Sequence, residues 1–176
     1  MRKFTVHWTM SAVFRNTVLQ ALPSAERLQL QLASLDSAAV QDLADDFAAS
    51  LPEFDLLLGL PGTEALMNTL ARLRGVPAMV IPLRAHQTKV ALPVEGSGAV
   101  AVLVTHLLDS GIPELQGLLF AAHHGLEVPV VAAAVERSSG LGRTRLELLN
   151  TKVRSAIPVA DTPRGLCEER RTPHVA

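Results

Sequence analysis

The sequence has no tyrosine, one cysteine and six aromatic side chains in 176 residues. A single cysteine, Cys167, excludes an intrachain disulfide and a zinc site built from cysteines. So few aromatic rings provide little surface on which nucleic-acid bases could stack. Sixteen basic residues against seventeen acidic ones give a formal net charge of −1, without the cationic field that binds nucleic acid non-specifically. We therefore expect no nucleic-acid partner.

Long apolar runs are also missing. Runs such as Val128–Val135, which contains Pro129, are far shorter than the roughly 18 residues that a membrane span needs. The first eight residues, Met1–Trp8, lack the apolar stretch and cleavage site of a signal peptide. We therefore expect a cytoplasmic protein that does not bind a membrane. Apolar residues still make up 48% of the chain, which allows a substantial core, and the length favours one domain.

The first 35 residues predict a small antiparallel β element. Phe4–Trp8 alternates between apolar and polar residues, Val13–Leu22 suits a second strand, and Arg27–Ala33 alternates strictly. Strict alternation is typical of a strand with one face in solvent.

A helix is predicted between Asp36, a suitable N-cap, and Pro52. Its apolar positions Val40, Leu43 and Phe47 recur at helical spacing. Three acidic residues are expected on its solvated face: Asp42, Asp45 and Asp46.

Residues 36–160 alternate short apolar strands with helices of about ten residues, a pattern that predicts an open parallel sheet flanked by helices. The first βαβ unit comprises the strand Leu56–Leu58, a helix that ends at Gly75, and the strand Ala78–Leu83. The second comprises the strand Ala99–Val104, the loop Thr105–Pro113, the helix Glu114–His124 and the strand Val128–Val135. In the second helix we expect Leu115, Leu118, Leu119 and Ala122 to face inward. A short helix and a last strand, Lys152–Ile157, follow, and residues 161–176 are predicted to form a flexible tail.

Ligands bind open parallel sheets outside the carboxyl ends of the strands. Three predicted loops lie there: Leu60–Thr63, Arg84–Thr88 and Thr105–Pro113. The third is followed by a helix N-terminus, whose backbone N–H groups could cradle an anion.

The segment Ala101–Pro113 consists of four apolar residues, a polar pair, two more apolar residues and Asp-Ser-Gly-Ile-Pro. The segment Asp55–Glu64, with its Gly/Pro turn and following helix, precedes it at a matching distance. In both segments the chain resembles the type I phosphoribosyltransferases, especially the adenine and xanthine branch, from about residue 36 to residue 159. The resemblance implies a homodimer, a ligand such as phosphoribosyl pyrophosphate (PRPP), a nucleotide or phosphate, and Mg²⁺ only together with PRPP. Residues 1–35 would form the "hood" over the site.

The resemblance also implies roles for individual residues. Thr105 and His106 stand where ribose would bind. The 5′-phosphate loop would be Asp109, Ser110, Gly111, Ile112 and Pro113, and Asp109 is the candidate catalytic residue. Gly62, Thr63, Arg84 and Lys89 would face pyrophosphate. A purely structural reading of Asp109 is a carboxylate that accepts local N–H groups at a helix start, and His106 could equally be loop surface.

Several residues depart from the family pattern. Thr105 and His106 replace two acids that bind the ribose hydroxyls and help to hold magnesium. Ile112 replaces a glycine, Pro113 lacks both a hydroxyl and an N–H, and Glu114 adds negative charge. At about 1 kcal/mol or more per lost hydrogen bond, these changes would weaken PRPP binding by several kcal/mol.

Three functions follow as hypotheses. The first is a phosphoribosyltransferase-related protein with a degraded PRPP site, weak or inactive, that binds a nucleotide-like or phosphate ligand. The second is an active purine phosphoribosyltransferase with a rearranged site. The third is a structural or regulatory dimer module.

Overall fold

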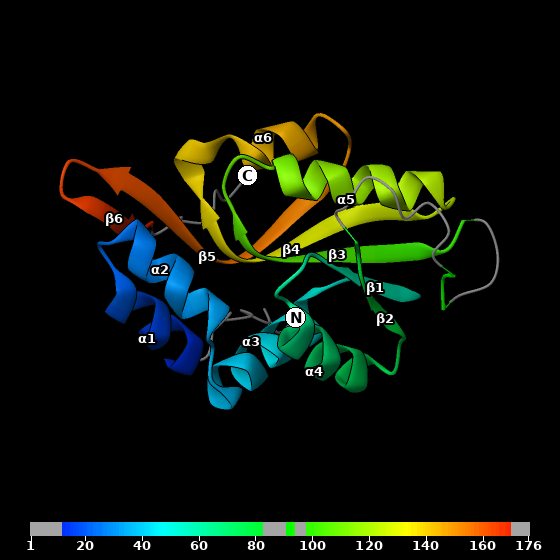
Figure 1. Cartoon of the computed structure of the whole chain (residues 1–176), viewed down its shortest axis with the longest axis horizontal. Coiled ribbons are helices and arrows are strands. Elements are labelled where there is room, and N and C mark those ends of the chain that lie inside the picture. Colours follow the sequence, from blue (N-terminus) through cyan, green and yellow to red (C-terminus); the bar gives the residue numbers. More distant parts are fainter. Residues whose placement is uncertain (1–11, 83–90, 94–97, 170–176) are drawn as a thin grey trace, which may run out of the picture.

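The computed structural model describes residues 12–82, 91–93 and 98–169. Within them, a six-stranded sheet in the order β2-β1-β3-β4-β5-β6 is covered by helices on both faces (Figure 1). The strands are β1 (Leu56–Gly59), β2 (Ala78–Val80), β3 (Val100–Leu108), β4 (Glu127–Arg137), β5 (Lys152–Thr162) and β6 (Gly165–Glu168). The helices are α1 (Ala12–Ala21), α2 (Ala25–Ala33), α3 (Ser37–Ser50), α4 (Glu64–Arg74), α5 (Ile112–His123), the 3₁₀ helix η1 (Ser138–Gly140) and α6 (Gly142–Glu147).

All neighbouring strands from β2 to β5 pair in parallel, which confirms the predicted open parallel sheet and both βαβ units. β3 is longer than expected, because it continues to Leu108. Thr105 and His106 therefore belong to the strand, and the loop before α5 begins only at Asp109. Pairing explains the extension: Thr105 lies opposite Ala133, and Leu108 lies opposite Glu136 of β4.

Side chains that alternate along the strands build one core on each face of the sheet. Leu57, Val102 and Ala132 pack with the helices α1–α4, which lie below the sheet in Figure 1. Leu56, Leu103 and Val131 belong to the second core, on the side of α5 and α6. Each fully buried leucine or valine contributes about 1.5–3 kcal/mol to folding, so the two cores hold the sheet between its helical layers.

The predicted N-terminal β element is wrong for the described residues, which form the helices α1 and α2. In α2 the alternation of Leu28, Leu30 and Leu32 misled the prediction, because residues four apart also share one helix face. Leu28 and Leu32 are buried, whereas Leu30 is 65% exposed. Ser24 caps the helix, since its hydroxyl accepts the N–H of Arg27 at 3.2 Å. The other predicted strand, Phe4–Trp8, lies outside the described residues.

Within the segment 161–176, predicted as a flexible tail, the described residues 161–169 are ordered, so the prediction is wrong for them. β5 runs on to Thr162, and β6 turns back to pair with it antiparallel. The α1–α2 connection supports β6, because the N–H of Leu166 donates to the carbonyl of Pro23 at 2.8 Å. Arg15 of α1 also forms an ion pair with Glu168 at 2.7 Å. The segment is therefore polar because it forms an edge strand of the sheet, and not because it is a flexible tail.

The helix α3 forms as predicted, with Asp36 as its N-cap and with Val40, Leu43 and Phe47 buried. Its acidic residues do not all face solvent. Asp42 accepts the N–H of Phe14 at 2.8 Å, and Asp46 lies 3.3 Å from Arg154. Asp45 alone of the three is exposed. These carboxylates thus connect α3 to α1 and to β5.

Candidate functional site

Polar residues lie at the carboxyl ends of β1, β3 and β4, which are neighbouring strands of the sheet. The turn after β1, the loop Asp109–Gly111 after β3 and the helix η1 after β4 lie there. The N–H of Leu60 donates to Val104 of β3 at 3.0 Å, which holds the β1 turn beside β3. Two predicted site residues, Arg84 and Lys89, lie outside the described residues.

Thr105 does not face a ligand position but is buried under α5. Its hydroxyl donates to Oε1 of Glu114 at 2.8 Å, and Glu114 is only 1% exposed. Oε2 of Glu114 has no hydrogen-bond partner within the described part of the chain. Burial raises the pKa of Glu114, the hydrogen bond from Thr105 opposes the shift, and the nearby charge of Asp109 adds to it. The buried carboxyl group therefore favours its neutral form more than an exposed one would.

His106 points to the opposite face of the sheet, toward the start of α4. Burial lowers the pKa of this partly buried imidazole, and the neighbouring carboxylate of Glu64 opposes that shift. Glu64 in turn accepts the N–H of Gly62 through Oε1 at 3.1 Å. Backbone N–H groups of Glu64 and Gly62, together with His106, lower the pKa of Glu64. A carboxylate of the chain itself therefore binds the turn where an external anion was predicted.

The turn after β1 also uses its own hydroxyl group. Thr63 is buried, and its hydroxyl donates to the carbonyl of Leu60 at 2.7 Å. Gly59 brings β1 close to α4, because a Cβ there would lie 2.5 Å from Thr63 Oγ1 and 2.4 Å from Met67 Sδ. This hydroxyl is therefore part of the packing between strand and helix.

The loop after β3 packs closely against the segment before α6. The N–H of Gly142 donates to the carbonyl of Asp109 at 2.8 Å, and Arg145 donates to the carbonyl of Ser110 at 2.5 Å. A Cβ at Gly142 would lie 2.5 Å from the Asp109 carbonyl oxygen, so only glycine fits without displacement. The Ser110 hydroxyl accepts the N–H of Ile112 at 3.3 Å. Neighbouring groups of the chain thus hold the loop in place.

Asp109 forms an ion pair with Arg137 at 3.2 Å. Arg137 was not among the site residues predicted from the sequence. Arg137 also binds both carboxylate oxygens of Asp161, at 2.9 and 2.6 Å. Hydrogen bonds from Arg137 and from the hydroxyl of Ser139 lower the pKa of Asp161 to about 2. The charged pair Glu136-Arg137 at the carboxyl end of β4 was the signal that could have identified this contact. Asp109 is therefore an ion-pair partner of Arg137.

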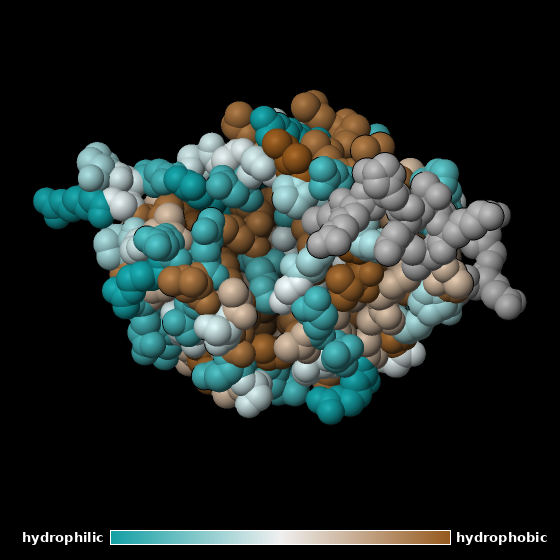
Figure 2. Space-filling view, viewed as in Figure 1, coloured by the Kyte–Doolittle hydropathy of each residue, from teal (hydrophilic) through white to brown (hydrophobic). Residues whose placement is uncertain are grey.

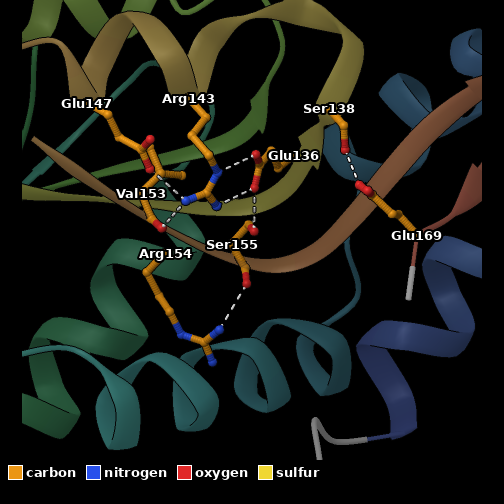
Figure 3. A network of polar contacts seen from close by, with 8 residues as sticks. All are labelled: Glu136, Ser138, Arg143, Glu147, Val153, Arg154, Ser155 and Glu169. Carbon is orange, nitrogen blue, oxygen red and sulfur yellow. Dashed lines mark hydrogen bonds and ion pairs between the residues drawn. The ribbon is translucent and has the colours of Figure 1, made fainter. Parts of the chain in front are cut away.

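A second polar network fixes α6 to the sheet (Figure 3). Glu136 is buried, and Arg143 binds both of its oxygens, at 2.7 and 2.6 Å. Glu136 also accepts the hydroxyl of Ser155 at 2.7 Å, and Arg143 reaches the carbonyl of Val153 at 3.0 Å. The neighbouring Ser138 hydroxyl contacts the carboxylate of Glu169. The contacts of Glu136 and Arg143 thus link β4, β5 and α6.

Across the described ranges, no cluster of three or more His, Cys, Asp or Glu side chains could hold a metal ion. Likewise, none of the helices in these ranges is long and apolar enough to cross a membrane.

Neither a protein-family model nor a curated protein matches the sequence. Solved structures do match. Orotate phosphoribosyltransferase from Mycobacterium tuberculosis H37Rv, solved with PRPP, aligns over 85% of this chain and 91% of its own, with a TM-score of 0.63 and 20% identity. The chain has a type I phosphoribosyltransferase-like fold.

Two other structures show the same phosphoribosyltransferase-like fold. Adenine phosphoribosyltransferase from Thermoanaerobacter pseudethanolicus aligns over 70% of this chain and 82% of its own, with a TM-score of 0.59 and 19% identity. UMP synthase from Leishmania donovani aligns over 73% of this chain, with a TM-score of 0.63 and 20% identity. The chain spans only 28% of the length of that UMP synthase.

Proposed function

We propose that this chain is a phosphoribosyltransferase-like protein with a degraded PRPP site, which binds PRPP weakly and does not transfer ribose phosphate. The hydrogen bond from Thr105 to the buried Glu114 carries this proposal. At this position the family resemblance implies an acid that receives ribose hydroxyls. Here a neutral hydroxyl donates its hydrogen inward, to a carboxyl group that solvent does not reach.

The turn after β1 supports the same conclusion on the pyrophosphate side. Glu64 accepts the N–H of Gly62, so a pyrophosphate would have to displace this carboxylate and approach its negative charge. Thr63 cannot compensate, since its hydroxyl donates to Leu60. Loss of a charge-assisted hydrogen bond costs about 1.5–3 kcal/mol, enough to weaken binding at least tenfold.

The loop after β3 supports the proposed loss of PRPP binding at the predicted 5′-phosphate position. Pro113 offers no N–H, and the N–H of Ile112 already donates to Ser110. Asp109, the residue proposed for catalysis from the sequence, is paired with Arg137. A 5′-phosphate would therefore find few free donors among these residues.

The residues present do not fit Mg²⁺. Three carboxylates of the described site already have other partners or a raised pKa: Asp109 is paired with Arg137, Glu64 accepts the N–H of Gly62, and Glu114 is buried with a raised pKa. Mg²⁺ prefers ionised oxygen ligands in near-octahedral geometry, which these groups do not supply together. We therefore propose no step that depends on this ion.

A thermal-shift series with turnover assays tests the proposal. PRPP with Mg²⁺, AMP, GMP and pyrophosphate are each added, and release of pyrophosphate is followed with adenine, guanine, hypoxanthine, xanthine and orotate. We expect no turnover with any base, and a rise in melting temperature only with AMP or GMP. Turnover of any of these bases would support an active transferase instead.

A further inference from the structure

The helix α5 carries its charge inside and its large apolar side chains outside. Glu114, the one Asp, Glu, Lys or Arg in α5, is 1% exposed. A Cβ at Gly117 would lie 2.9 Å from Leu103, so β3 leaves no room for a larger inward residue there. Leu119 is 71% exposed and Ala122 is also exposed, which makes their predicted inward positions wrong.

The neighbouring helix α6 and its flanking residues extend this apolar surface. Leu148 is 79% exposed, and the surface over α5 and α6 is largely brown at the top of Figure 2. We define the α5/α6 face by its five large apolar side chains that are more than half exposed: Ile112, Leu119, Leu141, Leu148 and Leu149. Together they expose on the order of 500 Å², near the upper end of the largest patch on a typical monomer.

The opposite helical layer differs. Its most exposed large apolar side chain, Leu30 of α2, lies among polar neighbours in a shallow pocket lined by Gln20, Arg27, Gln31 and Ser34. Single apolar residues of this kind are normal on a protein surface. Apart from Leu30, the large apolar side chains that are more than half exposed among the described residues therefore all belong to the α5/α6 face.

Basic residues flank this face on the side of α6. Residues 142–152 contain Arg143, Arg145 and Lys152 against one acid, Glu147, which gives the segment a net charge of +2. Glu147 forms an ion pair with Arg143 at 3.1 Å, so the exposed charges of Arg145 and Lys152 are not balanced within the segment. The exposed Glu127 at the start of β4 reduces this positive charge but does not cancel it.

We propose that the α5/α6 face binds a lipid surface that carries anionic headgroups. Its leucine and isoleucine side chains enter the boundary between headgroups and acyl chains, and Arg145 and Lys152 lie at the level of the headgroups. The expectation of no membrane contact rested on the short apolar runs, which exclude a spanning helix. A face that lies on a lipid surface needs no such run.

The composition of the face favours lipid over a protein partner. The centres of protein interfaces are enriched in aromatic residues, Met and Arg, and leucine is under-represented among the residues that dominate their binding energy. The five side chains of the face are leucine or isoleucine alone. Acyl chains accept such side chains without a complementary shape, because the hydrophobic effect has no direction. The proposal does not depend on whether the PRPP site is active.

Vesicle flotation of the full chain tests the proposal, with phosphatidylcholine vesicles that contain about 30% phosphatidylglycerol, at about 0.1 M salt. We expect wild type to float with these vesicles. The double variant Leu119→Gln/Leu148→Gln should bind them at least about tenfold more weakly, because less apolar area enters the lipid. Leu30→Gln is the matched control on the opposite layer and should bind like wild type. Glutamine leaves the net charge unchanged in both cases.

A second double variant separates charge from apolar contact. Arg145→Gln/Lys152→Gln should bind the anionic vesicles a few-fold more weakly than wild type. On vesicles of phosphatidylcholine alone, this variant and wild type should bind equally. A charge variant that binds anionic vesicles like wild type would contradict the role of these two residues.

Wild type that does not float with anionic vesicles, or a leucine double variant that binds them like Leu30→Gln, would overturn the proposal. Wild type that sediments at twice the mass of one chain and binds no vesicles would show that a second copy covers the face instead. Hydrogen exchange on wild type provides a readout without substitutions, should the double variant fail to fold. Protection of residues 112–123 and 142–149 should rise when anionic vesicles are added. No rise, or a rise confined to α1 and α2, would contradict binding through this face.

Discussion

The hydroxyl of Thr105 donates a hydrogen bond to Oε1 of Glu114 at 2.8 Å, between the end of β3 and the first turn of α5. The carboxyl group lies between sheet and helix, where its second oxygen has no partner among the described residues. The family resemblance assigns position 105 to ligand binding. This contact turns the Thr105 side chain toward the interior instead. The contact also holds the carboxyl group of Glu114 in the interior, where burial favours its neutral form.

Glu114→Gln should make stability less dependent on pH. Burial raises the pKa of Glu114, so the folded state binds the proton more tightly than the unfolded chain. Its contribution to stability is fully present below the ordinary glutamate pKa and is lost as pH rises through the raised value. We expect the variant to unfold at a higher urea concentration than wild type at pH 7.5, with a smaller difference at pH 4.5. A constant difference at both pH values would contradict a raised pKa.

Arg143→Met should destabilise the protein by about 3–5 kcal/mol, because it leaves the buried carboxylate of Glu136 without its bidentate partner. Urea unfolding at pH 7 measures the loss. Arg145→Met, on the same helix but with an exposed side chain, should cost less than about 1 kcal/mol. Adding Glu136→Gln to Arg143→Met should recover part of the loss, and an additive double variant would show that the pair is not coupled.

Gly142→Ala should destabilise the protein by about 1–3 kcal/mol, because its Cβ would approach the Asp109 carbonyl oxygen to 2.5 Å. The clash is with backbone and cannot be relieved by a side-chain rotation. Gly62→Ala is a useful comparison, since its Cβ would meet no atom of the described residues within 4 Å apart from its chain neighbours, and the positive φ of 94° alone opposes it. If Gly142→Ala melts like wild type, the loop after β3 is looser than described.

Glu64→Gln should bind inorganic pyrophosphate a few-fold more tightly than wild type, because the substitution removes a negative charge from the turn after β1. Calorimetric titration at low ionic strength measures the difference. Glu53→Gln is the control: this carboxylate is also exposed, precedes β1 at the other end of the sheet and pairs only with Arg74 at 3.4 Å among the printed ion pairs, so its loss should leave binding unchanged. Equal affinities for all three proteins would show that Glu64 does not oppose anions there.

The βαβ layout of the core could be predicted because its local signals agree. Asp36 caps α3 as predicted, and α4 ends at Gly75 as predicted, where the glycine adopts the left-handed conformation. Periodicity did not decide two features: the secondary structure of α2 and the inward face of α5. The leucines of α2 fit both a strand and a helix, and apolar residues surround α5, so no single stripe marks its inner face.

Only part of the candidate site could be predicted from the sequence. The neutral residues Thr105 and His106 stand where the family resemblance implies an acidic pair. The contact between Asp109 and Arg137 spans 28 residues and depends on β3 lying beside β4. The burial of Glu114 was also hidden, because an acid in the first turn of a helix is ordinarily expected to face solvent.

Calorimetric titration of wild type with PRPP in the presence of Mg²⁺ tests the proposed loss of PRPP binding most directly. Orotate phosphoribosyltransferase from M. tuberculosis, which was solved with PRPP, serves as the positive control. We predict a dissociation constant above about 1 mM, corresponding to less than about 4 kcal/mol of binding free energy. Micromolar binding by this chain would contradict the account.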